Sequence, residues 1–364
     1  MTLLAATTAG VKDTFVVKKI LSIAMATVMA FGLTTTTDVT SWAAPAKPDS
    51  DTTETGSSKT GKTSTENKAD QRSDLTRDPD IDFDAFSRPI EDRPHYVAIG
   101  DSYSVAGWGP VTFWEPCFRN AVDYPHMVSV ATALPLVEPA CIGGSGTGYW
   151  YSSKIKGTDV AVKVPYRKLI NKDSTLVTIN LGLNDIMLAY NKRLLRKCLA
   201  ASFTNTDRLN HGACEEAVEK ETRPLLNILP RVLEGIYKDA KKRAHKDALV
   251  VAVGYVNFFY GEAPCWDNLT IGPVDRAYIG SIFDSVNDAV KKAARKAKIP
   301  FYVPADHQIY LNSTCGVPGL RWTTTTGLPE ITYPLHPTPA ANAATTYHIA
   351  KMYWKHQQRL AGKR

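Results

Sequence analysis

The chain has 364 residues, of which 44% are hydrophobic and 22% charged, and its formal net charge is +7 at pH 7. These values are typical of a globular protein, and the length allows one large domain or two small ones. The basic residues are scattered along the chain and form no block, which argues against nucleic acid as a partner.

The first 44 residues have the three parts of a secretory signal peptide. Lys18 and Lys19 precede the apolar run ILSIAMATVMAFGL, and the small residues of SWAA follow it. The apolar run is short for a transmembrane helix. We expect a signal peptide in residues 1–44 and therefore a secreted, extracellular protein, with an uncleaved N-terminal anchor as the alternative.

Residues 45–80 differ sharply in composition from the rest of the chain. They are rich in Ser, Thr, Lys and Asp, and they contain almost no large apolar side chain. Such a segment buries too little surface to offset the entropy lost on ordering. We predict a disordered linker here and a folded domain over residues 81–364.

Strands and helices alternate along the predicted domain. The patterns predict strands at residues 95–100, 174–182, 248–256 and 300–305. They predict helices at residues 123–134, 214–247, 274–299 and 340–360. Pro224 and Pro230 are expected to interrupt the second helix. This alternation predicts an α/β fold, with a central parallel sheet and helices on both of its faces.

The cysteine content fits an exported protein. The chain has six cysteines, an even number, which suggests three disulfides whose pairing the spacing alone leaves open: Cys117, Cys141, Cys198, Cys214, Cys265 and Cys315. Neither CxxC nor HExxH occurs, so the sequence gives no support for a metal site, and it indicates no cofactor.

Four segments with polar or small residues lie at strand ends or in loops. In YVAIGDSYS, Ser102 follows the first strand at its carboxyl end, where open α/β sheets carry their sites. A glycine-rich loop spans residues 140–149, Asn184 lies just past the second strand, and His336 precedes the last helix. Each has a structural explanation when taken alone, as a turn, a helix N-cap or a surface histidine.

Together and in this order, the four segments resemble the SGNH hydrolase, or GDSL esterase/lipase, superfamily over most of residues 94–360. Gly100-Asp101-Ser102 matches the first block of that family and Gly182-Leu183-Asn184-Asp185 the third. The cysteine layout, the segment CFRNAVDYP and Trp322 resemble the secreted actinobacterial lipase and esterase branch. The resemblance implies a flavodoxin-like three-layer α/β/α sandwich.

The resemblance also implies a secreted serine ester hydrolase that acts through an acyl-serine intermediate. Ser102 would be the nucleophile and His336 its base. Backbone N–H groups of Ser102 and Gly143 and the side-chain amide of Asn184 would bind the oxyanion. The loop CIGGSG leaves Gly144 as the alternative to Gly143.

The chain departs from the common Asp-x-x-His pattern of the superfamily. Tyr333 stands three residues before His336, and the nearest preceding acid is Glu330. Some members of the actinobacterial branch use a main-chain carbonyl at this position. We therefore expect the Tyr333 carbonyl to accept the Nδ1–H of His336, with Glu330 as the alternative third member.

Two acids and three aromatic residues near these motifs have expected supporting roles. Asp101 is expected to stabilise the turn that carries Ser102, and Asp185 to brace Asn184. Three aromatic side chains could wall an acyl pocket or belong to the core: Trp108, Phe113 and Trp114.

The resemblance and the sequence order both favour disulfides between neighbouring cysteines: Cys117–Cys141, Cys198–Cys214 and Cys265–Cys315. The expected partner is an ester or lipid substrate, and the linker allows association with the cell envelope; no obligate protein partner is indicated. One alternative is an acyltransferase or deacetylase acting on envelope glycans or glycolipids. Another is a catalytically inactive binding module, against which the complete set of site residues argues.

Overall fold

The computed structural model describes residues 89–105, 116–154, 161–162, 164–188, 194–207, 209–259, 265–266 and 271–363. The predicted signal peptide and linker lie outside these residues, as do three of the predicted pocket residues: Trp108, Phe113 and Trp114.

The centre of the described domain is a five-stranded sheet in the order β2-β1-β5-β6-β7. Its strands are β1 (His95–Gly100), β2 (Leu136–Val137), β5 (Ser174–Asn180), β6 (Leu249–Val253) and β7 (Phe301–Tyr302). All neighbouring strands are parallel, which confirms the predicted parallel sheet. β7 is shorter than the predicted strand because Pro304 starts a 3-10 helix, η5 (Pro304–His307).

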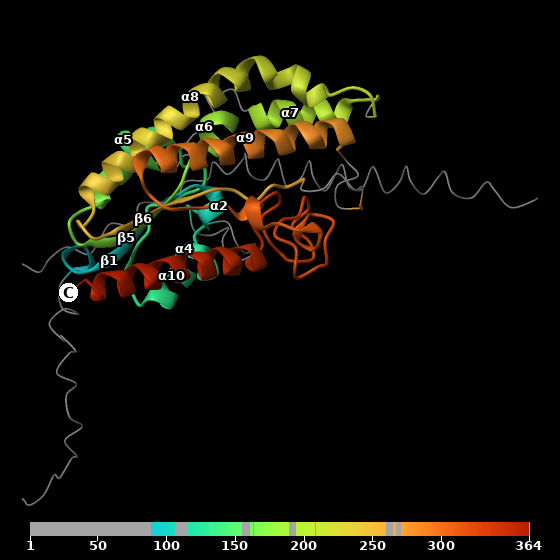
Figure 1. The fold of residues 1–364 in the computed structure, drawn as a ribbon. Coiled ribbons are helices and arrows are strands. Elements are labelled where there is room, and N and C mark those ends of the chain that lie inside the picture. The colour runs from blue at the N-terminus through green and yellow to red at the C-terminus, as the bar shows by residue number, and fades with distance from the viewer. Residues whose placement is uncertain are drawn as a thin grey trace, which may run out of the picture. The chain divides into compact units, whose positions relative to one another are not determined.

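Helices cover both faces of this sheet (Figure 1). α8 (Ala213–Arg243) and α9 (Pro273–Ala297) lie on one face, and α4 (Tyr124–Thr132) and α10 (Pro339–Ala361) on the other. Successive residues of β1 alternate between the two resulting cores. Val97 contributes to the core under α8 and α9, whereas Tyr96 contributes to the core that includes Ile349 of α10. Burial on both faces explains why the strands are largely apolar.

Shorter elements connect this framework. They are η2 (Ile90–Asp92), α2 (Ser102–Val105), α5 (Gly146–Trp150), η3 (Tyr166–Leu169), α6 (Leu183–Met187), α7 (Leu194–Thr204) and η6 (Tyr310–Asn312), with a separate antiparallel pair, β3 (Ser153–Lys154) and β4 (Ala161–Val162). No helix in the described part of the chain is both long enough and apolar enough to span a membrane.

The predicted interruption at Pro224 and Pro230 is wrong, because α8 runs through both prolines. A proline inside a helix removes one backbone hydrogen bond, but packing supplies most of the stability of a helix in a protein. Here Leu229 and Leu233 of α8 are buried in the core that covers the sheet. The packed face therefore keeps the segment helical.

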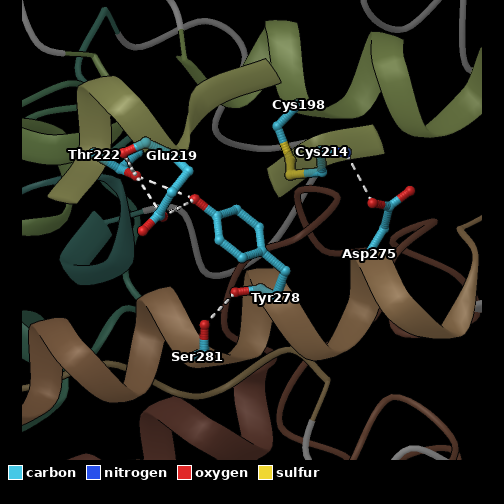
Figure 2. Close-up of a disulfide and its surroundings, with 7 residues drawn as sticks. All are labelled: Cys198, Cys214, Glu219, Thr222, Asp275, Tyr278 and Ser281. Carbon is cyan, nitrogen blue, oxygen red and sulfur yellow. Dashed lines mark hydrogen bonds between the residues drawn. A yellow bond between two sulfur atoms is a disulfide. The ribbon is translucent and has the colours of Figure 1, made fainter. Parts of the chain in front are cut away.

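The end of α8 that lies away from the sheet is fastened to both neighbouring helices. Cys198 of α7 and Cys214 of α8 form a disulfide (Figure 2). The N–H of Cys214 donates to Asp275 of α9 at 2.8 Å, and the hydroxyl of Tyr278 donates to Glu219 at 2.8 Å. These contacts join α7, α8 and α9 into one layer.

Candidate active site

Ser102 begins α2 directly after β1. In a parallel sheet, the carboxyl ends of the strands lie at the same edge, and side chains at this edge can be brought together. Ser102 is 8% exposed and lies close to the His336 loop that precedes α10. The hydroxyl of Ser102 and Nε2 of His336 are 2.8 Å apart, although 234 residues separate them in the sequence.

The other ring nitrogen of His336, Nδ1, lies 2.8 Å from the carbonyl oxygen of Pro334. The orienting group is thus a main-chain carbonyl, but it does not belong to Tyr333 as predicted. The Tyr333 carbonyl accepts the backbone N–H of His336 at 3.1 Å. Leu335 has φ 63°, and this left-handed residue turns the chain so that the imidazole folds back over Pro334.

Glu330, the alternative third member, is engaged elsewhere. Its two carboxylate oxygens accept hydrogen bonds from Arg321 at 2.9 and 2.7 Å, and Oε1 also accepts the N–H of Gly319. The Arg321 and Glu330 side chains are 2% and 5% exposed, so they form a buried ion pair. This pair organises the loop before His336 and does not contact the imidazole.

Hydrogen bonding and burial set the state of the imidazole. A carbonyl oxygen can only accept, so Nδ1 carries the hydrogen and Nε2 faces the Ser102 hydroxyl as an acceptor. The rings of Tyr103 and Tyr333 lie 5.1 and 4.8 Å from the His336 ring. Burial lowers the pKa of His336 to about 4, against the opposing effect of the Pro334 carbonyl. The imidazole is therefore neutral at neutral pH.

Three N–H groups near Ser102 are the predicted oxyanion donors. Among the described residues nothing accepts the backbone N–H of Ser102 or of Gly143. The N–H of Gly144, the alternative donor, is already bonded to the Cys141 carbonyl at 2.9 Å. This difference favours Gly143, whose φ of 74° suits a glycine. The Asn184 amide donates to the Gly144 carbonyl at 3.0 Å, which holds it beside the loop.

The glycine loop is fixed at both ends. At its start Cys141 is bonded to Cys117, and the N–H of Ile142 donates to the Cys117 carbonyl at 3.3 Å. At its end both carboxylate oxygens of Asp185 accept the N–H of Gly146, at 3.1 and 2.9 Å. Asp185 therefore braces the loop, and its expected support of Asn184 stays a prediction.

All three disulfides of the structure have the expected pairing: Cys117–Cys141, Cys198–Cys214 and Cys265–Cys315.

Asp101 stabilises the turn below Ser102, in agreement with the sequence analysis. It is fully buried, and its carboxylate accepts the N–H of Tyr103 and the hydroxyl of Tyr255, both at 2.8 Å. Burial raises the pKa of Asp101 to about 7, although these hydrogen bonds oppose the shift.

Two tyrosines that no sequence motif indicated hold the site together. Tyr103 packs against the His336 ring and donates its hydroxyl to the Leu335 carbonyl at 3.0 Å. Tyr255 lies after β6, which is separated from β1 by β5 in the sheet, and its hydroxyl donates to Asp101. Both residues look like ordinary core aromatics in the sequence, and no signal there distinguishes them.

Among the described residues, one group has the side chains of a metal site, and it lies apart from Ser102 and His336. The candidate ligand atoms of Asp123, His126 and Glu138 lie within 4.8 Å of one another. Asp123 is the N-cap of α4 and accepts from the backbone and ring of His126 and from the backbone of Asn120. Capping accounts for the positions of Asp123 and His126, and Glu138 lies 3.4 Å from the same ring nitrogen of His126.

Comparison with known proteins agrees with this geometry. A model of the GDSL-like lipase/acylhydrolase family matches residues 98–344. The chain is similar to Lipase 2 of Streptomyces coelicolor, with 25% identity over 264 residues that cover 70% of this chain and 85% of that protein. Two solved structures share the fold. Phospholipase A1 of Streptomyces albidoflavus has a TM-score of 0.53 and 20% identity over 72% of this chain and 99% of that one. An extracellular lipase of Streptomyces rimosus has a TM-score of 0.53 and 21% identity over 70% and 99%.

Proposed function

The chain belongs to the GDSL-like lipase/acylhydrolase family and is a carboxylic ester hydrolase, and from this premise we propose that Ser102 and His336 are its catalytic dyad. The observation that carries the proposal is the 2.8 Å contact between the Ser102 hydroxyl and Nε2 of a neutral His336. A serine hydroxyl becomes an effective nucleophile when a neighbouring base accepts its proton.

The proposed reaction has two halves. Ser102 Oγ attacks the ester carbonyl carbon while its proton passes to His336 Nε2. The oxyanion is bound by the N–H groups of Ser102 and Gly143 and by the Asn184 amide. Its collapse breaks the bond to the alcohol, which takes the proton from His336 and leaves an acyl-serine. Water then attacks the acyl-serine while its proton passes to His336. Collapse of the second oxyanion releases the acid and returns the proton to Ser102.

In this proposal the Pro334 carbonyl replaces the carboxylate of a triad. A carboxylate beside Nδ1 would stabilise the imidazolium that forms during attack by its charge, whereas a carbonyl does so through its dipole alone. The main contribution of Pro334 is therefore to fix the ring and its tautomer. The aromatic surroundings of His336 leave it little freedom to rotate away from Ser102.

We also propose that the protein is secreted. Three disulfides join all six cysteines, and disulfides of this kind persist in oxidising compartments. The signal-like segment at residues 1–44 supports the same location.

The direct test combines labelling with product analysis. The wild-type protein should react with a fluorophosphonate probe at Ser102, located by peptide mapping, and should hydrolyse a soluble nitrophenyl ester. Ser102→Ala should lose both properties and keep its circular dichroism spectrum. A folded Ser102→Ala variant that still turns over the ester would show that another residue is the nucleophile. Transfer of the acyl group to a sugar in preference to water would indicate an acyltransferase.

A further inference from the structure

A folded segment next to the candidate site exposes many large apolar side chains. Seven residues between positions 309 and 331 are each 45–57% exposed, and together they are called the 309–331 surface: Ile309, Tyr310, Leu311, Val317, Leu320, Leu328 and Ile331. Trp266, which is 57% exposed, follows Cys265, and the disulfide from Cys265 to Cys315 ties it to the same segment.

This segment folds around one buried side chain. The Arg321 guanidinium donates to the carbonyls of Thr314 and Leu328 and to the carboxylate of Glu330. The carbonyl of Leu320 accepts from the Asn312 amide at 2.9 Å. The exposed apolar residues are therefore carried by a single compact unit, which lies at the start of α10 (Figure 1).

The 309–331 surface has no free charge. Arg321 and Glu330 are the only charged residues between positions 308 and 335 in the sequence, and both are buried in their mutual ion pair. An apolar surface without charges fits an apolar partner whose surface is uncharged or zwitterionic. It offers no counterpart for an anionic polymer or an anionic membrane.

The Ile331 side chain contributes little to the stability of the fold. It is 46% exposed, and its φ of 51° lies in the left-handed region. This region disfavours β-branched residues and is better filled by glycine or asparagine. An exposed isoleucine at such a position costs conformational energy and buries little surface in return.

The unit is bonded directly to the loop that carries His336. The N–H of Leu335 donates to the Thr324 carbonyl at 2.8 Å, and the N–H of Thr338 donates to the Trp322 carbonyl at 3.0 Å. The unit that carries the 309–331 surface is therefore attached to the segments on both sides of His336.

We propose that the 309–331 surface docks the enzyme on aggregated acyl lipid with uncharged or zwitterionic head groups. This inference rests on the proposed function and names the physical form of its substrate. Apolar side chains, together with Tyr310 and Trp266, enter the boundary between head groups and acyl chains, where tyrosine and tryptophan are favoured. Docking brings the acyl esters of the lipid next to Ser102 and His336.

The test measures binding and catalysis separately. Secreted Ser102→Ala protein, which lacks the signal peptide and should not hydrolyse the lipid, is sedimented with phosphatidylcholine vesicles. Adding Leu320→Ser and Ile331→Asn should lower the partition coefficient about tenfold or more, because two large apolar side chains are lost. In the Ser102-containing protein, the same two substitutions should leave hydrolysis of a soluble acetyl ester within about twofold. Asn tolerates the left-handed backbone, so Tm should not fall at position 331.

The control replaces two apolar residues elsewhere that are more exposed than Leu320 and Ile331. Val130→Ser with Leu209→Ser removes side chains that are 84% and 74% exposed, and vesicle binding should not change. The proposal is overturned by equal binding of both double variants, by failure of the parent protein to bind, or by binding that needs anionic lipid and disappears at high salt. It is also overturned if light scattering shows a dimer that only the Leu320→Ser and Ile331→Asn protein loses. Absence of soluble-ester hydrolysis in the wild type would instead contradict the proposed function.

Discussion

Tyr255 donates its hydroxyl hydrogen to Asp101 at 2.8 Å, and the same hydroxyl oxygen accepts the N–H of Leu183 at 3.2 Å. Asp101 directly precedes Ser102, and Leu183 directly precedes Asn184. One buried phenol therefore links the turn that carries the proposed nucleophile to the turn that carries a proposed oxyanion donor. This link lets a residue outside the four family motifs set the distance between the two groups.

The first prediction tests this link with Tyr255→Phe. The substitution leaves one oxygen of buried Asp101 and the N–H of Leu183 without their partner, so the two turns can shift relative to each other. A small displacement of catalytic groups lowers rates strongly, and we expect kcat to fall roughly tenfold to hundredfold with little change in KM. Steady-state kinetics on a soluble ester measure both quantities.

Tyr237→Phe is the matched control, because Tyr237 is also fully buried and its hydroxyl has no hydrogen-bond partner among the described residues. It should keep wild-type kinetics. A double-mutant cycle with Asn184→Ala then tests the route of the effect. If Tyr255 acts partly through Asn184, the loss from Tyr255→Phe should be smaller in the Asn184→Ala background. Fully additive losses would show that the Asn184 turn is not involved.

The second prediction concerns the pH dependence of the rate. Burial lowers the pKa of His336 to about 4, below its ordinary value of 6.5, so the base stays neutral in mildly acidic solution. The acid limb of kcat/KM for a soluble ester should therefore have an apparent pKa near the lowered value. A pH–rate profile measures it. An acid limb centred on the ordinary histidine value would mean that the imidazole is solvated in the free enzyme.

The third prediction concerns stability and Asp101. Its pKa is about 7 in the folded protein and 3.8 in the ordinary carboxyl, so between these values the folded state binds a proton that the unfolded state lacks. The raised pKa of Asp101 therefore adds to the free energy of unfolding at low pH, by about 1.4 kcal/mol for each unit of difference between the two pKa values. This contribution is lost as the pH rises through 7. Asp101→Asn does not titrate. The Tm of the variant minus the Tm of wild type should therefore increase between about pH 5 and about pH 8. A difference in Tm that is the same at both pH values would contradict the raised pKa of Asp101.

The strand ends that carry the candidate site could be predicted because the signals for them lie within short stretches of sequence. Ser102 and Asn184 each follow a strand whose apolar pattern is unmistakable, and parallel strands bring their carboxyl ends to one edge. The pairing of Cys117 with Cys141 followed from the family resemblance and the order of the cysteines. None of these predictions required knowledge of how side chains pack.

The errors came from interactions that depend on three-dimensional packing. Whether the Tyr333 or the Pro334 carbonyl meets the imidazole depends on the left-handed conformation of Leu335, which a leucine does not signal. The continuity of α8 through Pro224 depends on the burial of the helix face elsewhere. The role of Tyr255 depends on a contact between residues 154 positions apart.

The fourth prediction separates the buried ion pair from catalysis. Glu330→Gln leaves the Arg321 charge buried without its carboxylate, and breaking such a pair costs about 3–5 kcal/mol. We expect a marked loss of Tm with kcat within severalfold of wild type, when active sites are counted by fluorophosphonate titration. A loss of three orders of magnitude in a fully folded variant would instead assign Glu330 to the catalytic machinery.

The last prediction distinguishes a disulfide that serves the site from one that serves the fold alone. Cys117–Cys141 closes 24 residues and holds the start of the loop that contains Gly143, whereas Cys198–Cys214 closes 16 residues between α7 and α8 (Figure 2). Loops of these lengths predict similar stabilisation, about 3 kcal/mol each.

Replacing either pair by serines should thus lower Tm by a similar amount. Only the Cys117→Ser and Cys141→Ser variant should also lose kcat, because its glycine loop can move away from Ser102 and weaken the proposed oxyanion contacts. Activity is measured well below both Tm values, so that unfolding does not contribute. Equal kcat losses in the two variants would show that the first disulfide has no particular influence on the site.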